Sequence, residues 1–187
     1  MSKFNFKETH IEDLYIIDPF IHRDDRGKLK KSFEKNIFAE HGINFEVAEE
    51  IETTSKKYTI RGLHFFLKES QAKLIRVSRG SIYDVAVDLR KNSKTFGEFF
   101  GIILSEENDK MLFIPSGFAH GCLSLEDKTT FYYLCSTKYS KEYDSGIIWD
   151  DHDLQIPWPV DIPKIILSDK DKNLMTFKQF KKNHEGL

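Results

Sequence analysis

The stretch KLIRVSRGSIYDVAVDLR, residues 73–90, decides which class of fold this chain adopts. Two apolar runs flank the pair Arg79-Gly80, and such a pair is typical of a turn between two strands. Both runs are rich in β-branched residues, namely Ile75, Val77, Ile82, Val85 and Val87. Because β-branched side chains favour extended backbone, the stretch predicts a strand, a turn and a second strand.

Similar short runs lie on both sides of this stretch. They are LYIIDPF (14–20), KLKKSF (28–33), INFEVAEEI (43–51), FGEFFGIILS (96–105), KMLFIPS (110–116), AHGCLSL (119–125) and TTFYYLCST (129–137). Short strands at intervals of about 8–12 residues favour an antiparallel sandwich or barrel. Since long βαβ crossovers are absent, the pattern predicts an all-β double-sheet jelly roll. Short helices are expected at FEKNIFAEHG (33–42) and LMTFKQFKKN (174–183).

The composition is that of an ordinary globular protein. The 187 residues are 40% apolar and 31% charged, which fits one domain with a sizeable core. A formal charge of −2 gives no reason to expect nucleic acid or an anionic membrane as partner. No apolar run is long enough to span a bilayer, and the start lacks the apolar core of a secretory signal. With two cysteines, Cys122 and Cys135, expected as buried thiols, we predict a cytoplasmic protein.

His64 stands in the strand-like stretch TIRGLHFFLKESQAKLIRV, residues 59–77. A single histidine in a strand is commonly a hydrogen-bonded structural residue. Here Arg61 and Lys73 lie in the same stretch, and His120 lies in a later strand. This set of polar residues exceeds what a jelly-roll core requires, which favours a site between the sheets.

A metal centre is the first alternative. Metal-binding jelly rolls often use an H-x-H pair, a nearby Glu and a later His after a P-x-G turn. The later half is present, because Pro115-Ser116-Gly117 precedes His120. The first half is not, because Phe66 stands two residues after His64. Two histidines without a good third ligand are poor metal coordination, so we predict no metal.

Acid–base chemistry is the second alternative. An imidazole near neutral pH removes a weakly acidic C–H proton if a carboxylate fixes its tautomer. A cation must then stabilise the enolate, and Lys73 is the candidate. Returning the proton to the other face requires an acid. Tyr132, Tyr133 and Tyr139 lie close together, and for Tyr132 we expect ordinary strand packing.

The chain resembles the dTDP-4-dehydrorhamnose 3,5-epimerase family, cupin-fold enzymes of nucleotide-sugar metabolism, over about residues 14–175. The matching motifs are DDRG (24–27), RGLHF (61–65), QAKLIRVSRGSIYDVAVDLRKNS (71–93), LSEEN (104–108), FIPSGFAHG (113–121), YDSGIIWDD (143–151), IPWP (156–159) and LSDKD (167–171). The resemblance implies one cupin-type domain over residues 1–187, a double-stranded β-helix with short flanking helices. It also implies a homodimer without metal or organic cofactor.

The resemblance assigns four catalytic roles. It implies that His64 is the base, that Asp171 is its carboxylate partner, that Lys73 stabilises the enolate and that Tyr133 is the acid. For substrate binding it implies that His120 and Tyr139 line the sugar pocket, and that Arg26 and Arg61 hold the nucleotide diphosphate.

Several positions depart from the family pattern. Phe66 replaces a glutamine, Glu49 and Ile51 replace an amide pair, and Lys31 replaces a glutamate. We therefore include Glu49 and Phe66 among the predicted substrate-binding residues. A site that has lost amide hydrogen bonds prefers different substrates from a site that has them. The sequence therefore does not predict the nucleotide, the sugar or the number of inverted carbon centres.

The resemblance implies an epimerase that inverts C3, C5 or both in a nucleotide-linked 4-keto-6-deoxy sugar. This activity belongs to carbohydrate biosynthesis, of lipopolysaccharide or another polysaccharide. Two alternatives remain: a keto-sugar isomerase on the same scaffold, and a catalytically silent protein that binds sugar nucleotides.

Overall fold

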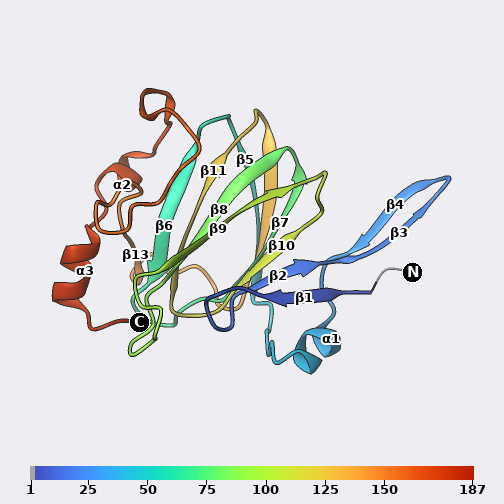
Figure 1. The fold of residues 1–187 in the computed structure, drawn as a ribbon, viewed down its shortest axis with the longest axis horizontal. Helices are drawn as coiled ribbons and strands as arrows, with labels where there is room; N and C mark the ends of the chain where they lie inside the picture. Colours follow the sequence, from blue (N-terminus) through green and yellow to red (C-terminus); the bar gives the residue numbers. More distant parts are fainter. Residues whose placement is uncertain (1–2) are drawn as a thin grey trace.

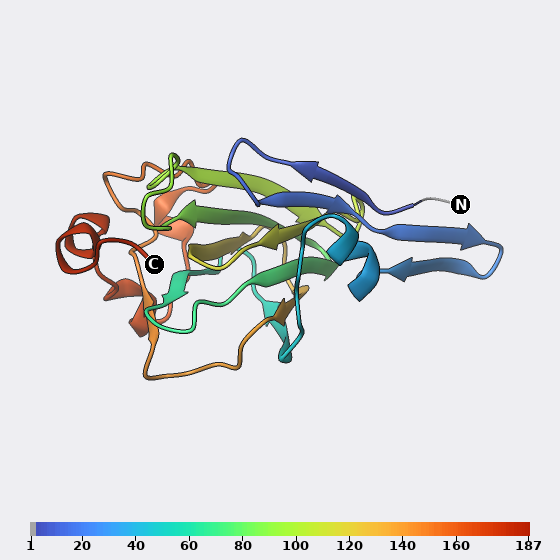
Figure 2. The same ribbon diagram turned by 90° about the horizontal axis from the view of Figure 1, so that it is seen from below.

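Two antiparallel β-sheets face each other and form the body of the molecule (Figures 1 and 2). The computed structural model describes residues 3–187, apart from the side chain of Ile162. The six-stranded sheet has the order β1 (Asn5–Glu8), β2 (Tyr15–Asp18), β10 (Met111–Ile114), β7 (Lys73–Arg79), β12 (Thr129–Cys135) and β5 (Glu49–Ser55). The five-stranded sheet has the order β13 (Asp144–Gly146), β6 (Ile60–Phe66), β11 (Phe118–Ser124), β8 (Ser81–Asp88) and β9 (Phe99–Ser105). The predicted jelly roll is confirmed.

The stretch 73–90 forms β7 and β8, and these two strands lie in opposite sheets. Gly80 turns the chain between them with a φ of +70°, a conformation that favours glycine. Ile75 and Val77 of β7 and Ile82 of β8 are buried in the same core cluster, between the two sheets. The predicted turn is thus a corner that carries the chain from one sheet to the other.

The C-terminal segment covers the outer face of the five-stranded sheet (Figure 1). It contains η1 (Ile162–Lys164), α2 (Asp169–Lys172) and α3 (Phe177–Asn183). The Thr176 hydroxyl and the Gln179 side chain form a capping box at the start of α3, and Phe180 is fully buried against the sheet. The predicted helix is confirmed, with a start three residues later than expected. None of the described helices is long and apolar enough to cross a membrane.

The outer face of the six-stranded sheet is covered by α1 (Lys35–Glu40) and the loop that follows it. Phe38 of α1 packs with Ile43 and Phe45 against this face. Residues 43–48 were predicted as strand, but β5 begins only at Glu49. Ile43 and Phe45 are buried because they pack onto the sheet, not because they pair within it, whereas Val47 is exposed. A pattern of hydrophobicity does not distinguish packing onto a sheet from pairing within it.

A separate hairpin, β3 (Phe20–Asp24) and β4 (Gly27–Lys31), projects from the body at the end opposite to α3 (Figures 1 and 2). Asp109, a buried carboxylate, holds the hairpin through ion pairs with Lys28, Lys30 and Arg23. Burial raises the pKa of Asp109, but Lys28 and Lys30 hold it below its ordinary value. The hairpin therefore has a defined attachment although it makes no sheet with the body.

Candidate active site

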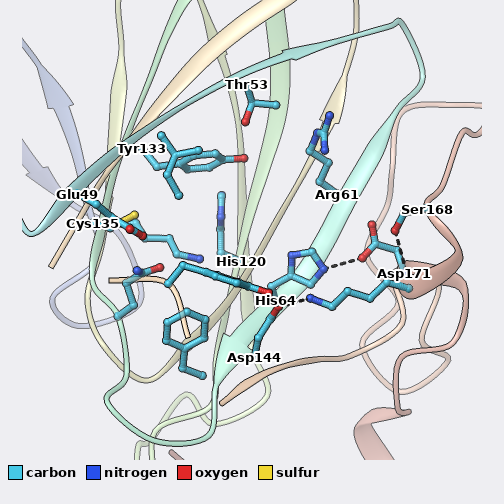
Figure 3. Close-up of a pocket in the computed structure, with 16 residues that line it drawn as sticks. Glu49, Thr53, Arg61, His64, His120, Tyr133, Cys135, Asp144, Ser168 and Asp171 are labelled. Carbon is cyan, nitrogen blue, oxygen red and sulfur yellow. Dashed lines mark hydrogen bonds and ion pairs between the residues drawn. The ribbon is translucent and has the colours of Figure 1, made fainter. Parts of the chain in front are cut away.

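A cavity of about 320 Å³ opens between the two sheets (Figure 3). The six-stranded sheet contributes residues of β5, β7 and β12, and the five-stranded sheet contributes residues of β6, β11 and β13. Nine of the ten predicted site residues line it: Glu49, Arg61, His64, Phe66, Lys73, His120, Tyr133, Tyr139 and Asp171. The tenth, Arg26, lies elsewhere.

His64 and Asp171 form a short contact on one side of the cavity (Figure 3). His64 Nε2 lies 2.6 Å from Asp171 Oδ1. Burial raises the pKa of Asp171, but the hydrogen bond from His64 holds it below its ordinary value. Because an ionised carboxylate only accepts, Nε2 of a neutral His64 carries the proton and Nδ1 keeps the free lone pair. The pair can therefore accept a proton at Nδ1.

The fold explains how residues 107 positions apart meet. Ile166 pairs with the chain just before β6, since its N–H donates to Tyr58 and its carbonyl accepts from Ile60. This pairing brings the start of α2 beside β6. The Ser168 hydroxyl then accepts a hydrogen bond from the backbone N–H of Asp171 at 3.1 Å, which caps α2 and fixes the carboxylate.

His120 lies beside His64, because the two are direct partners on the neighbouring strands β11 and β6. The strands approach closely at Gly62, which has a φ of +115° and where a Cβ would come within 2.6 Å of the His120 carbonyl. His120 Nε2 lies 3.0 and 3.1 Å from the two oxygens of buried Asp84. Burial lowers the pKa of His120 and outweighs the opposing effect of Asp84. The lowered pKa favours a neutral ring.

Asp84 was missed by the sequence analysis. It stands in the apolar run SIYDVAVD of β8, so a carboxylate inside a strand predicted to be buried was the available signal. Such a residue requires a polar partner in the core, and His120 is that partner.

Lys73 and Tyr133 extend from the six-stranded sheet, on β7 and β12. Burial lowers the pKa of Lys73, while the charges of Asp84 and Asp144 act in the opposite direction. No residue of the described chain forms a hydrogen bond or ion pair with its ammonium, which leaves this group available to a ligand.

Burial raises the pKa of Tyr133 well above its ordinary value, so the phenol keeps its proton. Its ring meets His120 edge-on, with 5.6 Å between the ring centroids. Figure 3 shows Tyr133 and the His64–Asp171 pair on opposite sides of the cavity. Tyr132, one residue earlier, lies on the outer face, where the Arg76 guanidinium stacks 3.9 Å from its ring.

Cys135 also lines the cavity, next to Lys73 across the strand pair. Burial raises the pKa of the Cys135 thiol to about 11 although the charge of Lys73 lowers it. A thiol in this state is a poor nucleophile. Both cysteines are free and buried, as the sequence predicted.

Asp144, which also lines the cavity, joins two segments. It accepts hydrogen bonds from the Tyr139 hydroxyl at 2.8 Å and from the Lys170 ammonium. The ring of Phe66 meets Tyr139 edge-on, with 6.0 Å between centroids. Asp144 and Lys170 were missed, although both lie in motifs that the sequence analysis used, because a motif match does not say which side chains point inward.

Arg26 lies at the tip of the β3–β4 hairpin, where its guanidinium pairs with Asp24 at 2.6 Å. Its side chain is 87% exposed and is not part of the cavity of its own chain. Arg61 does line the cavity, and its Nε donates to Ser55 at 3.1 Å.

Within residues 3–187, no group of three or more His, Cys, Asp or Glu side chains is arranged to hold a metal ion. The position that would complete an H-x-H pair is Phe66, which is buried. The donor set of the cavity therefore does not fit a metal centre.

Comparison with known proteins places these residues in a family. Residues 8–179 match the family model described as dTDP-4-dehydrorhamnose 3,5-epimerase. A relative of that name from Methanothermobacter thermautotrophicus is 46% identical over 174 residues, which cover 92% of this chain and 94% of that protein.

Solved structures agree. The dTDP-4-dehydrorhamnose 3,5-epimerase of Elizabethkingia anophelis has a TM-score of 0.91 at 37% identity, covering 97% of this chain and 99% of that one. The dTDP-6-deoxy-D-glucose-3,5-epimerase of Legionella pneumophila, solved with dTDP-4-keto-L-rhamnose, has a TM-score of 0.90 at 38% identity and covers 93% of each chain. The chain therefore belongs to the dTDP-4-dehydrorhamnose 3,5-epimerase family, whose named members are enzymes of the isomerase class.

Proposed function

We propose that this protein epimerises a nucleotide-linked 4-keto-6-deoxy sugar at C3, at C5 or at both. The observation that carries the proposal is the placement of a base and an acid on opposite walls of one cavity. His64, paired with Asp171, lies on the five-stranded sheet, and protonated Tyr133 lies on the six-stranded sheet. Inversion of a carbon requires proton removal from one face and proton return to the other.

The chemistry follows from the 4-keto group, which acidifies the C–H bonds at C3 and C5. His64 Nδ1 takes the proton, and Asp171 stabilises the imidazolium that forms. The electron pair of the C–H bond moves onto the keto oxygen, and the Lys73 ammonium stabilises this enolate. Tyr133 then delivers its proton to the opposite face of the same carbon. Exchange with solvent returns a proton to Tyr133 and removes one from His64.

The substrate carries a nucleotide diphosphate in this proposal, and Arg61 supplies a cation for it at the cavity wall. Several relatives are named for dTDP-linked sugars, so dTDP is the first carrier to test. A thermal-shift series with dTDP, CDP, GDP and UDP compares carriers directly, because a ligand raises stability according to its concentration relative to its Kd. A cytoplasmic location and a role in polysaccharide biosynthesis remain predictions, and the free thiols of Cys122 and Cys135 agree with the first.

The test is NMR of a 4-keto sugar nucleotide in D2O with protein first dialysed against a chelator. We expect deuterium at C3 and C5, and inversion of at least one of them. A silent binding protein introduces no label, and an isomerase moves the carbonyl instead of inverting a centre. Label confined to one carbon identifies a single-centre epimerase. Activity that depends on adding back a metal would contradict the proposal.

The state of Lys73 gives a pH prediction. Its ammonium is active when protonated, and burial lowers its pKa, so the proton is lost at a lower pH than from an ordinary lysine. We therefore expect kcat/KM for exchange to fall on the alkaline side, below the ordinary lysine pKa of about 10.4. Lys73→Arg should react more slowly but move this limb to higher pH, because a guanidinium stays charged. An unchanged alkaline limb in Lys73→Arg would assign it to another group.

A homodimer accounts for the position of Arg26. We propose that the β3–β4 hairpin of one copy reaches the cavity of the other, which would place Arg26 near the diphosphate. Arg26→Ala and His64→Asn should each be nearly inactive alone. In mixed dimers one site carries both defects and the other none, so an equal mixture should recover about a quarter of wild-type activity. A mixture that stays inactive after subunit exchange contradicts this arrangement.

A further inference from the structure

Glu49 brings a negative charge into the cavity, at the start of the edge strand β5. Its Oε1 is shielded from solvent and accepts no hydrogen bond from any residue the structure describes. Leaving a shielded carboxylate oxygen unpaired is unfavourable, and a ligand that donates a hydrogen bond removes that cost. The other side chains of the cavity do not provide this donor.

The strand register shows which part of a ligand Glu49 meets. Glu49 is the direct partner of Cys135, and Cys135 is the direct partner of Lys73, so the three side chains form one row on the inner face. Tyr133 is two residues from Cys135 and belongs to the next row on the same face. Figure 3 shows Glu49, Cys135 and Tyr133 on the same side of the cavity, facing His64. Glu49 is therefore beside the residues proposed to act on the keto sugar.

The other end of β5 is cationic. Ser55, six residues from Glu49 and roughly 20 Å away along an extended strand, is hydrogen-bonded to Arg61. A diphosphate placed at Arg61 lies far from the Glu49 charge, whereas a diphosphate placed near Glu49 would be repelled. Lys73 shares the Glu49 row, but it is the cation proposed to stabilise the enolate of the sugar. We therefore assign the Arg61 end to the carrier and the Glu49 end to the sugar.

We propose that Glu49 selects the sugar, by accepting a hydrogen bond from a hydroxyl or ammonium substituent of the ring. This inference rests on the proposed epimerase function and specifies the class of its substrate. A sugar with only hydrogen or methyl at the facing position leaves the carboxylate unpaired and is rejected, since a site built for a hydrogen bond discriminates strongly against an analogue without it.

The test uses 4-keto sugars on one nucleotide that carry a hydroxyl, an ammonium or a hydrogen at C2, C3 or C6. The readout is kcat/KM for deuterium exchange at C5, a proton that every sugar in the series retains. At one of these positions, wild-type protein should prefer a donor over hydrogen by about tenfold or more. Glu49→Leu should lose this preference. Glu49→Gln should keep it for the hydroxyl and lose it for the ammonium, because an amide oxygen accepts without carrying charge.

Glu52→Gln is the matched control, because Glu52 lies on β5 and points to the outer face beside Tyr132. It should behave as wild type. The role of Glu49 is wrong if wild type shows no preference for a donor over hydrogen, or if Glu49→Leu shows the same preference as wild type. In both cases, exchange at C5 still supports the epimerase. Absence of exchange at both C3 and C5 in every sugar overturns both the role of Glu49 and the epimerase.

Discussion

His64→Asn is expected to introduce no measurable deuterium into a 4-keto sugar nucleotide, while it binds the nucleotide nearly as well as wild type. Asparagine keeps a polar side chain on β6 but cannot accept a proton at neutral pH. Loss of a general base costs about 10²–10⁴-fold in rate. The side chain is 30% exposed, so the substitution should leave the core intact. NMR in D2O measures the exchange, and a thermal shift with the nucleotide measures binding.

Two further variants make this result specific. Asp171→Asn should exchange slowly rather than not at all, because the amide cannot stabilise the imidazolium although His64 remains. His152→Asn is the matched control, since His152 is 96% exposed and outside the cavity. It should exchange at the wild-type rate. Wild-type exchange by His64→Asn would show that another residue is the base.

The sequence predicts the strands of the body well, because their signal is local. The run 73–90 contains both the β-branched residues of β7 and β8 and the turn at Gly80. It does not show that the two strands lie in opposite sheets. That depends on their partners, β10 and β12 for one strand, β11 and β9 for the other. Those partners come from distant segments, and no local pattern encodes their register.

The site depends even more on distant contacts. His64 can be singled out as a polar residue in a strand, but nothing local connects it to Asp171. Only the resemblance to a family linked these two residues, and the structure supplies the physical reason in the pairing of Ile166 with the chain before β6. Asp84 had a local signal, as a carboxylate in an apolar run, but its partner His120 lies on another strand.

Arg26 shows a different limit of prediction from sequence, which is set by the assembly of subunits. Its motif, DDRG, served only to identify the family, and in the structure it forms the turn of the β3–β4 hairpin. The predicted role as a ligand of the diphosphate requires a second copy of the chain, because Arg26 is remote from its own cavity. A sequence pattern identifies the residue type that suits a phosphate, whereas the subunit that uses it is a property of the assembly.

Tyr133→Phe is expected to separate label from inversion. His64 and Lys73 serve proton removal at either carbon, since C3 and C5 flank the same carbonyl. The acid instead has to reach the face that receives the new proton. Without the phenol, a proton removed by His64 still returns from the same side as deuterium. The variant should therefore incorporate label at a substantial rate while inverted product falls by about 10²-fold or more.

Tyr132→Phe is the matched control, because it removes a phenol from the adjacent residue on the outer face of β12, under Arg76. It should label and invert as wild type does. NMR of the sugar protons scores label and configuration separately for C3 and C5 in each protein. Loss of inversion at one carbon alone in Tyr133→Phe would mean that a second acid serves the other carbon. Tyr139 also lines the cavity and is the phenol to examine. Equal loss of label and inversion at both carbons would instead show that Tyr133 takes part in proton removal, and the division of roles between the two sheets would be wrong.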